Sequence, residues 1–145
     1  MIKGVIIEKL KEMNDERGSV KRMLRCDAPY FERFGEIYFS TVNPGFIKGW
    51  KKHLKQTQHF AVPVGVLQLV IYDDRADSST KGEVQEIRIG EGNYQLVRIP
   101  PNVWYSFKAK STGPAMIANC TDMPHNPKES VQLEISDPSI PYSWD

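Results

Sequence analysis

A short stretch in the first half of the chain, GWKKHLKQTQHF at residues 49–60, combines groups that move protons with groups that carry positive charge. Alternate side chains of a β-strand share one face, so Lys51 and His53 are expected on one face and Trp50 on the other. An imidazole titrates near neutral pH and suits proton transfer, whereas an ammonium group attracts anions. The stretch is therefore either a strand of a working site or a solvated edge strand protected by its lysines.

The residues in and around this stretch are spaced like the first cupin motif, Gly-x5-His-x-His-x(3,4)-Glu-x6-Gly. The two glycine positions and the three ligand positions are occupied, in chain order, by Gly45, Lys51, His53, Gln58 and Gly65. Of the three side chains at the ligand positions only the imidazole is a good metal ligand, because an ammonium has no lone pair and an amide oxygen is weak. The spacing predicts a cupin strand, and the side chains predict that it binds no metal.

A second stretch, IPPNVWYSF at residues 99–107, is similar to the second cupin motif, Pro-x-Gly-x2-His. Asn102 stands where the glycine would be, and asparagine is the next-best residue for a left-handed turn. Tyr105 stands where the histidine would be and brings a phenol in place of a metal ligand. Trp104 and Tyr105 are either core aromatics or a pair at the mouth of a barrel, where Trp104 would stack on a base or a sugar.

The elements that must position these groups are strands. Runs rich in Val, Ile, Phe and Tyr recur at short spacing between clusters of turn residues, and they cover residues 4–10, 37–42, 59–73, 83–89, 94–99, 115–120 and 131–135. Many short strands with regular turns indicate a sandwich or a small barrel. We therefore expect an all-β cupin, a double-stranded β-helix or jelly roll, as one domain over residues 1–145 with an N-terminal strand and an irregular C-terminal arm.

The composition excludes several classes of function. The chain has 145 residues, of which 40% are hydrophobic and 26% charged, as in a globular domain with a core. A net charge of +1 argues against nucleic acid or an acidic membrane as a partner, and no segment approaches the length of a membrane span. Cys26 and Cys120 have no close cysteine neighbour, so we expect two buried reduced thiols and a cytoplasmic location.

Five stretches, in order over nearly the whole chain, resemble the dTDP-4-dehydrorhamnose 3,5-epimerase family and the related nucleotide-sugar 3,4-ketoisomerases, which are metal-free cupins. NDERGSV resembles the family's Asp-x-Arg-Gly opening, and GFIKGWKKH resembles GvlRGLHyQ of the epimerases and RGFHAH of the ketoisomerases. YDDRADSST resembles vDlRxxSpT, IPPNVWYSF resembles iPxGfaHGF, and DPSIPYSW resembles the closing DPxixixW. The resemblance implies a homodimeric isomerase without a cofactor, which removes a proton next to the ketone of a nucleoside-diphosphate 4-keto-6-deoxy sugar in polysaccharide or deoxysugar biosynthesis.

The resemblance also implies roles for individual residues. Asp137 matches the aspartate that orients the family's catalytic base, and Lys51 stands where that base, a histidine, would be. Lys48 takes the place of an arginine that contacts the diphosphate, and Arg17 matches another arginine of the family. Lysine offers a phosphate a point charge, whereas arginine offers a fork of two donors.

Two further positions depart from the family, and they leave the proton-transfer roles open. Gln58 stands at the lysine that stabilises the enolate, and Ala118 falls about where a tyrosine returns the proton. By one hypothesis His53 is the base, Lys51 stabilises the enolate and Tyr105 returns the proton. By the other, Lys51 itself is the base.

Two other functions remain open at this stage. The departures from the family would suit a cupin that has lost catalysis but still binds a nucleotide sugar as a scaffold or a regulator. The fold alone would also suit a cupin that binds an unrelated small ligand.

Overall fold

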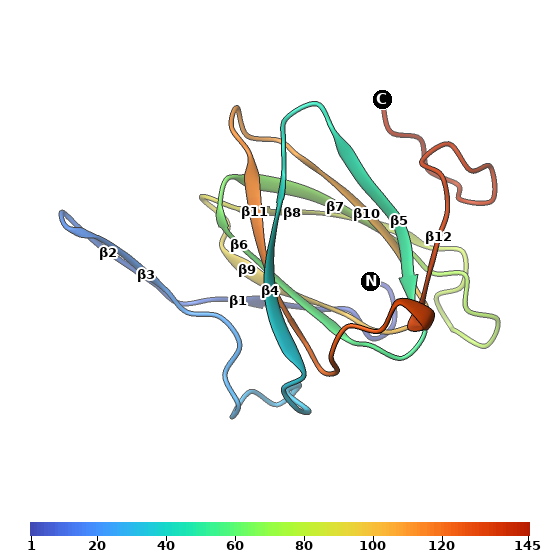
Figure 1. Cartoon of the computed structure of the whole chain (residues 1–145), viewed down its shortest axis with the longest axis horizontal. Coiled ribbons are helices and arrows are strands. Elements are labelled where there is room, and N and C mark those ends of the chain that lie inside the picture. Colours follow the sequence, from blue (N-terminus) through green and yellow to red (C-terminus); the bar gives the residue numbers. More distant parts are fainter.

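The computed structural model describes residues 1–145 as twelve β-strands and one short 3-10 helix, arranged mainly in two antiparallel sheets (Figure 1). The first sheet has the order β1 (Ile6–Lys9), β9 (Gln95–Ile99), β6 (Gln58–Val64), β11 (Ala115–Thr121) and β4 (Glu36–Val42). The second has the order β12 (Ser130–Gln132), β5 (Ile47–His53), β10 (Trp104–Ala109), β7 (Val66–Tyr72) and β8 (Val84–Gly90). Strands that are neighbours in a sheet are often distant in the chain, as in a jelly roll.

The core lies between the two sheets and follows from the alternation along each strand. In β7, Leu67, Leu69 and Ile71 are fully buried and belong to a cluster of 17 core residues that both sheets supply. Val70, between them, points to the other face of the second sheet and packs in a smaller cluster with Trp50, Trp104 and Ile140. The C-terminal arm, which follows β12, covers that outer face and contributes the isoleucine. Both faces of the second sheet are therefore apolar, which explains the nearly continuous hydrophobic run of β7.

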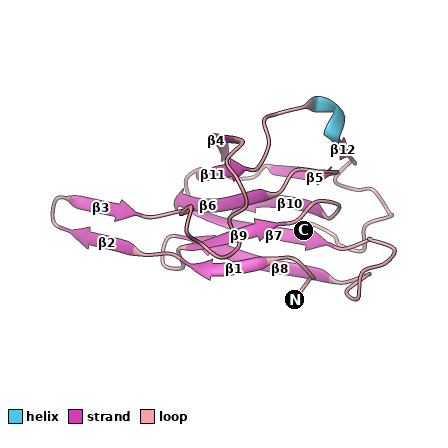
Figure 2. Cartoon of the chain, turned by 90° about the horizontal axis from the view of Figure 1, so that it is seen from below, coloured by secondary structure: helices cyan, strands magenta, loops and turns pink.

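One hairpin stands apart from the body of the molecule. Strands β2 (Glu12–Asp15) and β3 (Gly18–Lys21) pair only with each other and project outward, as both views make plain (Figures 1 and 2). Every residue of the hairpin is exposed except Lys21, which is partly covered. The 3-10 helix η1 (Pro127–Glu129) lies at the other end of the molecule and leads directly into β12 (Figure 2).

The all-β jelly roll predicted from the sequence is confirmed, and the N-terminal strand and the irregular C-terminal arm are present. The β2–β3 hairpin and the helix η1 were not predicted, because both are short and mostly polar. The expectation of two buried thiols is wrong for Cys26, which is exposed, whereas Cys120 is buried. The structure contains no helix with the length and apolarity needed to cross a membrane.

Candidate active site

The imidazole of His53 lies at the centre of a buried chain of polar groups. Its Nδ1 is hydrogen-bonded to Glu129 Oε1, and its Nε2 lies 3.1 Å from the hydroxyl of Tyr105. Strand β12 begins with Ser130, which pairs with His53 of β5, so the helix η1 places Glu129 directly beside the imidazole. All three side chains of the chain Glu129–His53–Tyr105 are at least nine-tenths buried.

The surroundings of His53 and Glu129 determine the protonation states of these two side chains. Burial lowers the pKa of His53 below its ordinary value although Glu129 pulls in the opposite direction, so the imidazole is neutral at neutral pH. Burial alone would raise the pKa of Glu129, but His53 and the backbone N–H groups of Lys55 and Gln56, each 3.2 Å away, outweigh it and the net pKa is lowered. A neutral imidazole beside a carboxylate donates its Nδ1–H to that carboxylate and presents the Nε2 lone pair to the Tyr105 O–H.

The phenol of Tyr105 connects this chain to a cavity between the two sheets. Burial raises the pKa of Tyr105 far above its ordinary value, so the phenol keeps its proton and donates it to the imidazole. The cavity has a volume of about 360 Å³, and its polar lining comes from both sheets: Tyr38, Ser40, Lys48, Lys51, Tyr105, Asn119 and Gln132. His53 is not among the lining residues, so Tyr105 is the member of the chain that a ligand in the cavity would touch.

Lys51 and Lys48 supply the positive charge of the cavity. The side chain of Lys51 forms no ion pair, whereas the next residue, Lys52, lies on the opposite face of β5 and pairs with Asp74 at 2.6 Å. Lys48 also lines the cavity and donates to the backbone carbonyl of Thr41 at 2.6 Å. An unpaired ammonium in a partly enclosed cavity is suited to bind an anion or an oxygen on which negative charge develops.

A bulge in β5 allows both lysines to face the cavity. Gly49 pairs with Ser106 and Lys51 pairs with Tyr105, so Trp50 is the extra residue between them. Strict alternation would place Lys48 and Lys51, three residues apart, on opposite faces. The backbone of Gly49 has a φ of +119°, and an added Cβ would lie 2.7 Å from backbone atoms of β10, so only glycine fits there.

The structure brings together four of the sequence-predicted site residues and places a fifth behind them. Lys48, Lys51 and Tyr105 line the cavity, and His53 contacts Tyr105 from behind. Gln58 is fully buried and is hydrogen-bonded to the side chains of Gln56 and Asn119 rather than exposed to the cavity.

The other three predicted site residues lie away from the cavity. Trp104 is on the outer face of the second sheet, where its Nε1–H donates to Asp74 at 2.9 Å. Asp137 accepts hydrogen bonds from its neighbour Ser139 on a turn of the C-terminal arm and does not contact His53 or Lys51. Arg17 lies at the exposed tip of the β2–β3 hairpin, paired with Asp15. The prediction that these three residues belong to the site is therefore not supported by their positions. The cavity lies between the inner faces of the two sheets, whereas these residues lie on an outer face, on the C-terminal arm and on the hairpin.

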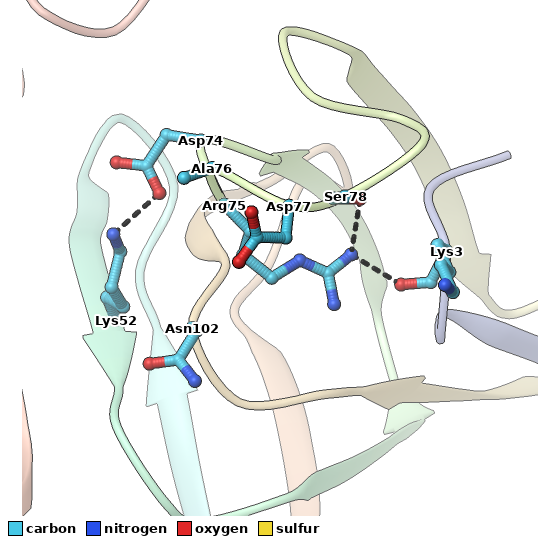
Figure 3. A pocket seen from close by; sticks show the side chains of 8 residues that line it. All are labelled: Lys3, Lys52, Asp74, Arg75, Ala76, Asp77, Ser78 and Asn102. Carbon is cyan, nitrogen blue, oxygen red and sulfur yellow. Dashed lines mark hydrogen bonds and ion pairs between the residues drawn. The ribbon is translucent and has the colours of Figure 1, made fainter.

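A wider pocket lies on the other side of β5 and has different chemistry (Figure 3). Three of its five charged side chains already have partners, since Lys52 pairs with Asp74 and Arg75 binds Asp73 and the carbonyl of Lys3. The ion pair of Asp73 and Arg75 organises the loop after β7. The inner cavity, with its unpaired lysine and buried proton-transfer chain, is therefore the better candidate for an active site.

Three candidate functional residues were not predicted from the sequence: Glu129, Tyr38 and Asn119. Glu129 is 76 residues from His53 in the chain and lies in a polar segment, so no local pattern connects the two. The Asn126-Pro127 pair was a signal for a helix start, because Asn126 caps η1. It predicts a turn in this segment but not which strand the turn faces.

Comparison with known proteins identifies the family of the chain. The model of the dTDP-4-dehydrorhamnose 3,5-epimerase family matches residues 1–145. The chain is 36% identical over 146 residues to the spore coat polysaccharide biosynthesis protein SpsL of Bacillus subtilis (strain 168), with 99% of this chain and 97% of that protein covered. It is 38% identical over 120 residues to "Probable low-salt glycan biosynthesis epimerase Agl13" of Haloferax volcanii, with 81% and 77% covered.

A solved structure is also similar over the whole fold. The crystal structure of a dTDP sugar isomerase from Desulfovibrio desulfuricans G20 has a TM-score of 0.96 to this chain at 47% identity, over 99% of this chain and 92% of that one. The match of the family model to every residue, together with relatives well above 30% identity, leads to one conclusion: the chain belongs to the dTDP-4-dehydrorhamnose 3,5-epimerase family.

Proposed function

We propose that the protein is an isomerase that acts on a nucleoside-diphosphate 4-keto-6-deoxy sugar by removing a proton next to the ketone, in the synthesis of a polysaccharide or a deoxysugar. Membership of an epimerase family supports the reaction class. The observation that carries the proposal is the buried chain Glu129–His53–Tyr105, which ends at a cavity holding the unpaired Lys51.

The proton-transfer chain suits the first half of such a reaction. A neutral His53 accepts the Tyr105 proton at Nε2 while the Tyr105 oxygen takes the proton from the sugar carbon. Glu129 stabilises the imidazolium that forms and holds the ring in the required tautomer. His53 thus acts through Tyr105, which is the group placed to touch the substrate.

The cationic side chains suit the charged parts of the substrate. The electron pair of the broken C–H bond moves into an enolate, and Lys51 is placed to bind the enolate oxygen. Lys48 lies at the part of the lining nearer to solvent and is exposed, so we assign it to the diphosphate.

The alternative of a binding protein without catalysis rests on Lys51 and Ala118, which stand where the family has its histidine and tyrosine. The burial of the Glu129–His53 pair argues against this alternative. Burying a charged group costs stability, so its presence in the interior indicates a function. Such a pair, joined to a phenol in a cavity, is expected of a catalyst and not of a mere nucleotide-sugar receptor.

Solvent exchange of a dTDP-linked 4-keto-6-deoxyhexose in D2O tests the proposal. The wild-type protein is expected to introduce deuterium beside the ketone, and His53→Asn is expected to abolish the exchange. His125→Asn is the matched control, because His125 lies in an exposed loop outside the cavity lining, and it should exchange like wild type. Absence of exchange by the wild-type protein would refute the proposal. A thermal-shift screen with dTDP, UDP, GDP and CDP accompanies the exchange measurement, and absence of any nucleotide shift as well would also exclude the alternative of a nucleotide-sugar-binding protein without catalysis.

We also propose a homodimer. Strand β4 is the edge of the first sheet and exposes Ile37 and Phe39, an apolar edge that a second copy of the chain would cover. Light scattering should give about twice the chain mass of 16.6 kDa, and Phe39→Glu should give the monomer mass. A wild-type protein with the monomer mass would contradict this.

A further inference from the structure

The wall of the cavity that faces Tyr105 carries a second phenol, which the proton-transfer chain described above does not use. Tyr38 of β4 belongs to the first sheet, whereas Tyr105 and Lys51 belong to the second. The hydroxyl of Tyr38 lies 2.9 Å from Asn119 Nδ2, and Asn119 also lines the cavity. Tyr38 pairs with Asn119 across β4 and β11, one position beyond Ala118, where the family's tyrosine would stand.

The orientation of the Asn119 amide is fixed by its other partners. Its Oδ1 accepts the backbone N–H of His59 at 3.2 Å, so its Nδ2 must face the other way. The two hydrogens of Nδ2 are then donated to Gln58 Oε1 and to the Tyr38 hydroxyl. The oxygen of Tyr38 is therefore an acceptor in this bond, and its own proton remains free to be donated into the cavity.

Further amides hold Gln58 in place behind Asn119. Gln58 Nε2 donates to Gln56 Oε1, and Gln56 Nε2 donates to the backbone carbonyl of Met123 at 2.8 Å. Each donor in this row determines the orientation of the next amide, and the row ends at the Tyr38 hydroxyl. The buried Gln58, which replaces a lysine of the family, thus serves to position a phenol and not to bind the enolate.

We propose that Tyr38 is a second catalytic residue, the acid that gives a proton to the sugar carbon from the face opposite Tyr105, so that the protein inverts a carbon centre. The proposal rests on the proposed function and deepens it. Inversion requires proton removal on one face and proton delivery on the other, which needs groups on two walls of the site. Movement of a ketone between neighbouring carbons can be carried out by groups on a single face, and would leave Tyr38 without a role.

The complete step balances in protons and electrons. The C–H bond beside the ketone breaks, its proton goes to the Tyr105 oxygen as the Tyr105 proton moves to His53, and its electron pair forms the enolate. The enolate carbon then takes the Tyr38 proton, a new C–H bond forms on the opposite face, and the ketone is restored. The Tyr38 oxygen is left as a phenolate that accepts the Asn119 N–H bond. Solvent then removes the proton from His53 and returns one to Tyr38.

The test compares exchange with inversion in the full-length protein. Wild type and Tyr38→Phe are incubated in D2O with a dTDP-linked 4-keto-6-deoxyhexose, and NMR measures deuterium incorporation and the configuration of each carbon beside the ketone. Tyr38→Phe is expected to keep exchange within about tenfold of wild type, with deuterium in the uninverted sugar, while inversion falls about 100-fold or more. Tyr105→Phe is expected to lose exchange and inversion together.

Tyr30→Phe is the matched control. Tyr30 stacks on His59 outside the cavity, with ring centroids 6.1 Å apart, and its removal should change neither rate. Three outcomes overturn the proposal: inversion by Tyr38→Phe at the wild-type rate, loss of exchange together with inversion in a variant that still shows a dTDP thermal shift, or a wild-type product in which the ketone has moved without inversion. A wild-type protein that exchanges no deuterium at all would instead overturn the proposed function.

Discussion

Replacement of Glu129 by glutamine probes the proton-transfer chain with a minimal change of shape. Proton removal places a positive charge on the His53 imidazole, and the Glu129 carboxylate beside it is only 6% exposed. Two opposite charges about 4 Å apart attract by about 4 kcal/mol at an effective dielectric constant of about 20. The loss of this attraction in the transition state corresponds to a fall in kcat of about 1,000-fold. KM should change little, because neither Glu129 nor His53 lines the cavity.

The assay is steady-state turnover of the keto sugar nucleotide at pH 7.5, with Glu134→Gln as the matched control on the exposed arm. Glu129→Asp should recover part of the rate, because it keeps the charge although the shorter side chain reaches less well. Thermal melting must confirm that both Glu129 variants fold, since the carboxylate also accepts the N–H groups of Lys55 and Gln56. A folded Glu129→Gln protein with kcat within tenfold of wild type would refute the role assigned to the proton-transfer chain Glu129–His53–Tyr105.

Other parts of the molecule give three further predictions. Lys51→Met should lower kcat about 100-fold or more while thermal stability stays the same or rises, because it removes an unpaired charge from a cavity; measurable turnover near the wild-type rate would contradict this. Because burial lowers the pKa of His53 below 6.5, kcat/KM should be level above pH 6.5 and fall only as the pH drops through this lowered pKa, where Nε2 becomes protonated; a rise toward acid pH would have the wrong sign. Asp73→Asn should reduce the free energy of unfolding by about 2–4 kcal/mol in a urea titration with kcat unchanged, because burial of Asp73 is outweighed by bonds from Arg75, Ser78 and Thr80 that lower its pKa; an unchanged midpoint would show the loop to be held otherwise.

The fold was predictable because its signals are either local or spaced at fixed intervals. The glycine spacing around β5 identified a cupin strand, and the apolar runs located most strands of both sheets. The exceptions have physical reasons. Strand β10 was contained in a motif rather than in an apolar run, and the β2–β3 hairpin buries almost nothing, so neither periodicity nor hydrophobicity marks it.

The candidate site was predictable only where a local motif marks the residue. His53 and Lys51 follow from alternation along β5, and Tyr105 follows from the second cupin motif. Lys48 was predicted through the family resemblance and not from alternation, because it shares their face only through the bulge at Trp50. The hint for that bulge was Gly49, since a glycine inside a strand often marks a bulge. Glu129 depends on a pairing of β12 with β5 that the sequence does not encode locally.

In the family that the sequence resembles, the base is a histidine at the position of Lys51, whereas the proton-transfer group proposed here, His53, lies two residues further along β5. Two residues along a strand return to the same face, so a histidine at 53 still points to the interior of the fold, about 6–7 Å further along β5. A carboxylate placed to support a base at 51 would then be too far away to support one at 53. Asp137 lies out on the arm, while Glu129 is brought beside His53 by the Ser130 pairing. Lys51 lines the cavity without a carboxylate partner, which is why the proposed mechanism assigns its ammonium group to the enolate oxygen.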